Sequence, residues 1–183
     1  MIPTLPLALR NRLAETILAA LHDEHARTEL ASLAKPEAAE RWLAGAERRW
    51  MWALTERARR ASAALADRPA RRAADLGAAL EDATRLFDAG LHFEVHEILE
   101  PHWVASGGEE REALQGLIQA AVGFQHLANG NPAGARSLLI EASERLHGRR
   151  LLGRDLESFA RAMAELAERV ATGEPVVPPE FPR

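Results

Sequence analysis

The chain has 183 residues, with 23 basic and 27 acidic side chains and a net charge of −4. A hydrophobic content of 47% is enough to build a core, which excludes a disordered chain. No apolar run reaches the roughly 18–20 residues that a membrane span needs, and the first residues lack a signal-peptide pattern. Cysteine is absent, which excludes disulfides and thiolate metal sites. We therefore expect a cytoplasmic protein without a membrane partner.

Alanine, leucine, arginine and glutamate dominate the chain, and no segment alternates with the period of a strand. The pattern predicts an all-α fold. The expected helices cover 6–33, 37–65, 70–89, 92–105, 110–128, 132–147 and 155–172. We expect three parts: a helical hairpin extension over 1–72, a helical core over 73–172, and an extended tail over 173–183. The prolines of the tail prevent a helix, so it should run over the surface.

A weak internal repeat with a spacing of 40 residues joins two parts of the expected core. Gly90 aligns with Gly130, and each glycine lies between two predicted helices. A glycine in this place allows the left-handed conformation that ends a helix. The repeat predicts antiparallel helical hairpins that stack as in tetratricopeptide arrays.

The segment LHFEVHEILEPHW, residues 91–103, contains three of the seven histidines. On a helical wheel, His96 and Glu100 are i, i+4 neighbours on the flank of an apolar face. Glu94 and Glu97 point elsewhere, either to water or to another element. A partly buried His–carboxylate pair needs hydrogen-bond partners.

The next helix supplies candidate partners, because Gln115, Gln119 and His126 follow one another along a single stripe. Small residues on another face, such as Gly116 and Gly123, would let a neighbouring helix approach closely. We expect a buried polar layer between the two hairpins, with aromatic walls. The candidate pocket consists of His92, Phe93, His96, Glu97, Glu100, Trp103, Gln115, Gln119 and His126.

The same residues carry a family resemblance. A Phe-x-x-Gly turn, a Phe-x-x-His-Glu-x-x-Glu helix that ends near a Trp, a Leu-Gln-Gly-Leu-Ile-Gln helix and a Gly-Asn turn follow in order. In this sequence they are Phe87, Gly90, Phe93, His96, Glu97, Glu100, Trp103, Leu114 to Gln119, Gly130 and Asn131. The pattern resembles the small all-helical bacterial and archaeal family catalogued as domain of unknown function 309, over roughly residues 80–150. The resemblance implies stacked hairpins and brings no established activity.

Three interpretations of the polar layer remain open: a structural hydrogen-bond network, a pocket for a small molecule or peptide, and a metal or acid–base site. Residues 96–100, HEILE, lack the last histidine of the zinc-protease motif, so we expect no tightly held metal and no cofactor. The leading hypothesis is a non-enzymatic binding or interaction module. The alternative is a small hydrolase or metal-dependent enzyme that uses His96 with Glu100 or Glu97.

A second alternative is nucleic-acid contact through the Arg/Trp helix 41–60, where arginines alternate with exposed tryptophan. The acidic net charge argues against it. An amphipathic helix of this kind depends on packing, so we expect it to dock on the core with Trp42 and Trp50 mostly buried. A homodimer through this region is a further alternative.

Overall fold

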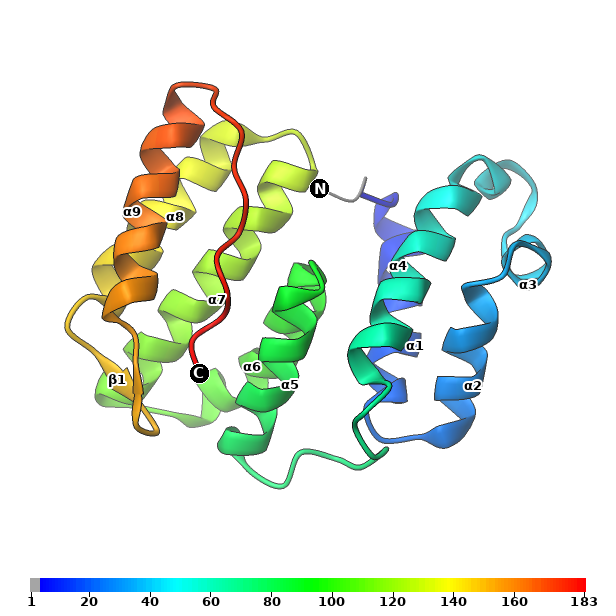
Figure 1. The fold of residues 1–183 in the computed structure, drawn as a ribbon, viewed down its shortest axis with the longest axis horizontal. Coiled ribbons are helices and arrows are strands. Elements are labelled where there is room, and N and C mark those ends of the chain that lie inside the picture. The colour runs from blue at the N-terminus through cyan, green and yellow to red at the C-terminus, as the bar shows by residue number, and fades with distance from the viewer. Residues whose placement is uncertain (1–3) are drawn as a thin grey trace.

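The computed structural model describes residues 4–183, and these residues form an all-α fold, as the sequence predicts. Figure 1 shows two groups of helices side by side. The first group contains α1 (Leu7–Ala20), α2 (Glu24–Leu33), α3 (Pro36–Trp42), the 3₁₀ helix η1 (Gly45–Trp50) and α4 (Met51–Leu65). The second contains α5 (Leu76–Asp88), α6 (His92–Ala105), α7 (Gly108–Ala128), α8 (Pro132–Leu146) and α9 (Glu157–Ala171). Within the described range, no helix is both long and apolar enough to cross a bilayer.

The two long helices predicted over 6–33 and 37–65 are each interrupted, so that part of the prediction is wrong. Asp23 ends the first one, because its carboxylate accepts hydrogen bonds from the backbone N–H groups of His25 and Ala26 and so caps α2. The second breaks after α3, where Gly45 has a φ of +28°. Residues 1–3, at the start of the expected extension, lie outside the described range.

The helices predicted in the second half are present within a few residues of their expected ends. Gly90 and Gly130 have φ values of +77° and +72°, so both predicted turns use the left-handed conformation. The helix predicted over 70–89 begins late, because Asp75 caps α5 by accepting a hydrogen bond from Ala78 N–H. A short antiparallel hairpin that the sequence pattern did not indicate, β1 (Arg150–Leu151) with β2 (Arg154–Asp155), joins α8 to α9.

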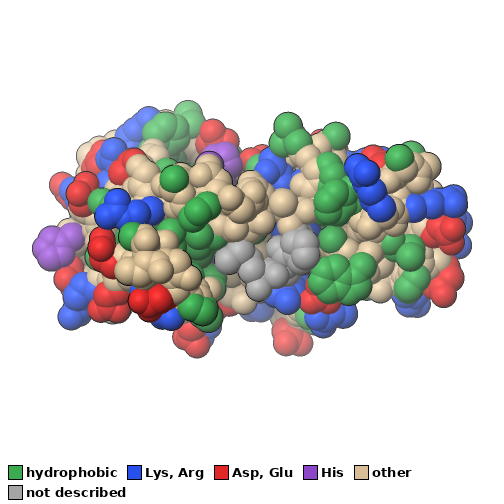
Figure 2. Space-filling view, turned by 90° about the horizontal axis from the view of Figure 1, so that it is seen from above, with side chains coloured by type: hydrophobic (Ala, Val, Ile, Leu, Met, Phe, Trp, Pro, Cys, Tyr) green, Lys and Arg blue, Asp and Glu red, His purple; other side chains and the backbone are tan. Residues whose placement is uncertain are grey.

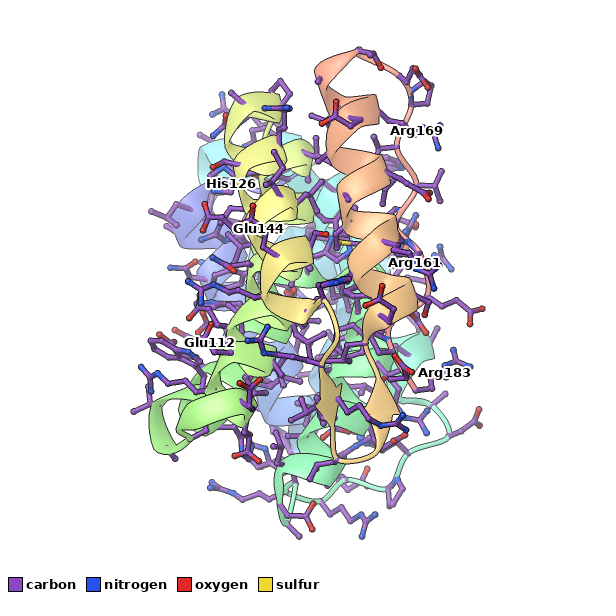
Figure 3. The ribbon with its side chains drawn as sticks, turned by 90° about the vertical axis from the view of Figure 1, so that its left-hand side faces the viewer. Glu112, His126, Glu144, Arg161, Arg169 and Arg183 are labelled. Atoms are coloured by element: carbon purple, nitrogen blue, oxygen red, sulfur yellow. The ribbon has the colours of Figure 1, made fainter. Side chains whose placement is uncertain are left out.

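Residues 174–183 form no helix or strand, and the end of this tail is buried rather than on the surface. Phe181 is 2% exposed and packs against Phe87 and Phe159, with ring centroids 5.1 and 5.9 Å apart. The carboxylate of Asp88, at the end of α5, accepts hydrogen bonds from Phe181 N–H and from the guanidinium of Arg183. Figure 3 shows Arg169, near the end of α9, and Arg183 at opposite ends of the tail.

Buried ion pairs join the first group of helices to the second. Arg57 of α4 donates from Nη2 to both carboxylate oxygens of Glu94 on α6, at 3.0 Å each, and neither side chain is more than 4% exposed. Arg68, which follows α4, binds Asp82 of α5 through both its Nε and Nη2. Trp42 and Trp50 are partly buried against the same core. The first group is therefore docked on the second through paired charges as well as apolar contacts.

Figure 2 shows a different arrangement on the outer surface, where basic and acidic side chains are interspersed over the face seen from above. An exposed ion pair of this kind joins Arg48 to Glu40, whose side chains are 58% and 56% exposed. Such pairs contribute little to stability because water screens them. A substitution in a surface pair can therefore serve as the control for a substitution in a buried pair, when their effects on stability are compared.

The substitution Glu94→Gln is expected to destabilise the protein by about 3–5 kcal/mol, because it leaves the guanidinium of Arg57 buried without a counter-charge. Glu40→Gln, the same change in an exposed pair, should cost less than about 1 kcal/mol. Urea unfolding followed by circular dichroism measures both. Equal midpoints for the two variants would show that the Arg57–Glu94 pair does not hold the two groups together.

Phe181→Ala is expected to lower the free energy of unfolding by about 3 kcal/mol, because it removes a buried ring from an aromatic cluster. Val177 lies in the same tail and is 74% exposed, so Val177→Ala should change stability by less than about 0.5 kcal/mol. Thermal unfolding of both variants is the measurement. If Phe181→Ala unfolds at the wild-type temperature, the tail end is not part of the core.

Candidate functional site

The helix α6 has two sides with different surroundings. His92, Glu94, Val95 and Leu99 are buried against the neighbouring helices. The side chains of His96, Glu97 and Glu100 are 28%, 35% and 51% exposed. The helical period explains this division, because it places the four buried residues on the arc of α6 that faces the core and the other three on the adjoining arc. The predicted candidate residues are therefore split between two environments.

His92 occupies the first position of α6, directly after the turn at Gly90. Its ring lies between Phe87 and Phe124, with centroids 4.9 and 5.2 Å away, and the residue is 6% exposed. Burial, and secondarily the charge of Arg57, lowers the pKa of His92 from 6.5 to about 3. The Nε2 atom has no hydrogen-bond partner among residues 4–183. His92 is therefore a neutral, incompletely paired polar group in an aromatic environment.

Arg57 and Glu94 form the charged part of the buried side, and neither was among the predicted site residues. Arg57 uses its Nη2 for both oxygens of Glu94, and its buried Nε has no partner in the described part of the chain. An unpaired buried N–H is costly, so a hydrogen-bond acceptor placed there would be stabilised. Glu94 was expected to point to water or another element; it points to α4.

A cavity of about 510 Å³ lies against Arg57, between α4, the α5–α6 turn, the end of α7 and the tail. Its volume is within the range of small-molecule sites. Apolar groups from α5, α7 and the tail form much of its wall, and three arginines, two acids and an amide provide polar groups. The lining residues are Arg57, Arg60, Phe87, Asp88, Gly90, Gln125, Ala128, Val176, Val177, Pro178, Pro179, Glu180 and Arg183.

The partly exposed side of α6 brings the predicted His–Glu pair together. His96 Nδ1 lies 3.0 Å from Glu97 Oε1, and His96 Nε2 lies 3.9 Å from Glu100 Oε2. Among the described residues, these three form a group whose potential ligand atoms lie close enough together to hold a metal ion.

The two aromatic residues predicted as pocket walls are covered by arginines. Arg10 stacks on Phe93 and Arg111 stacks on Trp103, with distances of 4.0 and 3.9 Å from the guanidinium carbon to the ring centroid.

The expected polar layer between α6 and α7 is wrong, because the stripe on α7 is directed elsewhere. Gln119 donates to Glu141 of α8 at 2.6 Å, and His126 Nδ1 lies 2.8 Å from Asn131 Nδ2. Gln115 is partly buried, and none of the three hydrogen-bonds to α6 within residues 4–183. Figure 3 shows His126 near the end of α7, on the side where α8 packs.

The small residues of α7 explain this direction. A Cβ added to Gly116 would lie 2.7 Å from the side chain of Leu146, and one added to Gly123 would lie 3.2 Å from Leu139. The helix that packs closely on Gly116 and Gly123 is therefore α8. This packing brings Glu141 of α8 within hydrogen-bond distance of Gln119. A helical wheel gives the direction of a side chain but not which helix covers it.

The buried histidine makes stability depend on pH. Between pH 7 and pH 5 the unfolded chain takes up a proton at His92, with its ordinary pKa of 6.5, while the native state does not. Unfolding is therefore favoured as pH falls. Over this range the free energy of unfolding of wild type should decrease by about 2 kcal/mol more than that of His92→Leu. Urea unfolding at both pH values measures the difference. The control is His147→Leu, whose side chain is 74% exposed in wild type and whose removal should leave the loss near the wild-type value. If the free energy of unfolding decreases equally in wild type and in His92→Leu, His92 is not a buried neutral side chain.

Comparison with known proteins matches part of the chain, including α6. Residues 80–138 match the model described as "Domain of unknown function (DUF309)", and the match includes α6 and α7. No curated protein and no solved structure matches the chain significantly. The segment with the Phe-x-x-His-Glu-x-x-Glu pattern thus matches the DUF309 model, in agreement with the resemblance, and the description of that family gives no activity.

Proposed function

We propose that the chain is a non-enzymatic binding module whose small-molecule ligand occupies the cavity beneath the tail. The observation that carries this proposal is the cavity of about 510 Å³, whose wall includes Arg57, an arginine in a largely apolar environment. Binding sites typically combine an apolar wall with a few polar groups that fix orientation.

The lining defines the chemistry of the ligand. Arginine donates hydrogen bonds and accepts none, so the group next to Arg57 is an acceptor oxygen, such as that of a carboxylate or a carbonyl. The ring of Phe87 and the side chains of Ala128, Val176 and Pro178 favour an apolar body. The ligand is therefore a small organic molecule with an oxygen acceptor at one end.

The hydrolase alternative has less support. A general base works best with a pKa near the operating pH, and burial holds the pKa of His92 at about 3. His96, the histidine named in that alternative, does not line the cavity.

Nucleic-acid contact through residues 41–60 also has less support. Glu40 pairs with Arg48, Glu56 pairs with Arg59, and Arg57 is buried. These arginines are already engaged within the chain, which reduces the positive charge available for phosphates.

The fluorescent probe 8-anilinonaphthalene-1-sulfonate tests the cavity, because it joins an anionic oxygen acceptor to an apolar body. Wild type is expected to bind it saturably at one site. Ala128→Trp places a large ring in the cavity and should abolish that binding. Fluorescence titration of the full chain is the measurement.

The control is Ala105→Trp, the same substitution at an exposed position at the end of α6. This variant should bind the probe as wild type does, and circular dichroism verifies that both variants are folded. Equal binding by the two variants, or no saturable binding by wild type, would refute the proposed site.

A further inference from the structure

The loop between α4 and α5, residues 66–75, crosses from the first group of helices to the second (Figure 1). It has no regular structure, but the side chain of Arg68 holds its backbone from inside. The guanidinium donates to the carbonyls of Pro69 and Arg71, at 2.9 and 2.8 Å, and to that of Leu21. Arg71 N–H also donates to the carbonyl of Leu21, at 3.0 Å. The backbone of Arg71 is therefore fixed at both its N–H and its carbonyl.

The same guanidinium is neutralised within the chain. Arg68 binds the carboxylate of Asp82 on α5, and the two side chains are 9% and 5% exposed. Both members of this pair are engaged with each other and with the loop. The pair therefore anchors the loop to α5 and offers little charge to a molecule outside.

The neighbouring surface arginines are different. Most arginines of the chain bind a carboxylate, a carbonyl or an aromatic ring. Within residues 4–183, the side chains of Arg71, Arg72 and Arg85 make no ion pair, hydrogen bond or cation–π contact, and all three are exposed. Their positive charge is therefore not neutralised by the chain itself.

These three arginines line one cavity of about 180 Å³, formed by the loop and α5. Besides Asp82, two acids belong to its wall. Glu81 is paired with Arg154, which lies outside the cavity. Asp67 is exposed and has no ion-pair partner in the described part of the chain. Because the other acids are paired, Asp67 alone opposes three free guanidiniums, and the cavity keeps a net positive charge.

We infer that this cavity binds the phosphate group of a small phosphorylated molecule through Arg71, Arg72 and Arg85. A phosphate monoester has a charge of about −1.5 to −2 and three strong acceptor oxygens, so it can engage several guanidiniums at once. The fork of N–H groups on arginine matches that geometry. A carboxylate has one charge and two oxygens, which is too little for three arginines. Complete small-molecule sites have volumes of about 300–1,000 Å³, so this smaller cavity holds one group of the ligand.

The fixed loop supports this inference, because a site that is ordered before binding does not lose that conformational entropy when the ligand arrives. The buried bonds of Arg68 supply this order for Arg71 and Arg72. The inference is independent of the proposed cavity beneath the tail, since the two cavities share no lining residue.

The test is isothermal titration of the full chain with inorganic pyrophosphate at low ionic strength, where exposed charges are little screened. Wild type is expected to bind it saturably at one site. Arg72→Gln and Arg85→Gln should each weaken binding by about tenfold, because each removes one charged donor. Asp67→Asn should strengthen binding by about threefold, because it removes an exposed repulsive charge.

The matched control is Arg41→Gln. Arg41 is also exposed, without an ion pair in residues 4–183, and does not line the cavity. Its substitution changes the net charge by the same amount, so this variant should bind pyrophosphate as wild type does. Circular dichroism verifies that all variants are folded.

Four results would overturn the inference. They are no saturable binding by wild type, unchanged binding by Arg85→Gln, weaker binding by Asp67→Asn, and equal weakening in Arg41→Gln and Arg85→Gln. The last of these would show that pyrophosphate responds to net charge and not to the cavity.

A phospholipid headgroup carries the same phosphate chemistry, and sedimentation with vesicles that contain phosphatidic acid distinguishes this source. Wild type is expected to stay in the supernatant. Sedimentation of wild type that Arg85→Gln abolishes would assign the cavity to a lipid surface and overturn its assignment to a small soluble molecule.

Discussion

The most deeply buried ion pair of the described residues, between Arg57 and Glu94, joins the first group of helices to the second. Removing two charges from water is expensive, and their attraction compensates only when both are well hydrogen-bonded. Here Arg57 satisfies both oxygens of Glu94 through a single nitrogen, so its own Nε stays unpaired. The pair therefore joins α4 to α6, and Arg57 also lies at the wall of the cavity.

The helix α6 joins two chemical environments because its polar residues recur on both sides of an apolar stripe. On one side His92 and Glu94 are buried, and the low dielectric there keeps His92 neutral. On the other side the side chains of His96 and Glu100 are 28% and 51% exposed, so water reaches both.

Local signals in the sequence predicted much of the fold. Glycines 90 and 130 fix the hairpin turns wherever the helices pack, which is why the helices around them are close to prediction. Asp23 is also a local cap signal, and it could have indicated the break before α2. The wheel left open whether Glu94 points to water or to another element, and no local rule connects it to a partner 37 residues away. Likewise, the stripe with Gln119 was visible, but which helix covers it depends on tertiary packing.

The proline-rich tail cannot form a helix, and its residues instead form part of the cavity wall. Proline has no N–H to satisfy, so a proline-rich segment can cross the mouth of a cavity without backbone partners. It is fixed at its two ends, where Arg169 donates to the carbonyl of Pro175 and Arg154 donates to that of Pro182. The burial of Phe181 fixes the far end more strongly than either hydrogen bond. Residues 176–179 therefore form one wall of the cavity, between two anchored ends.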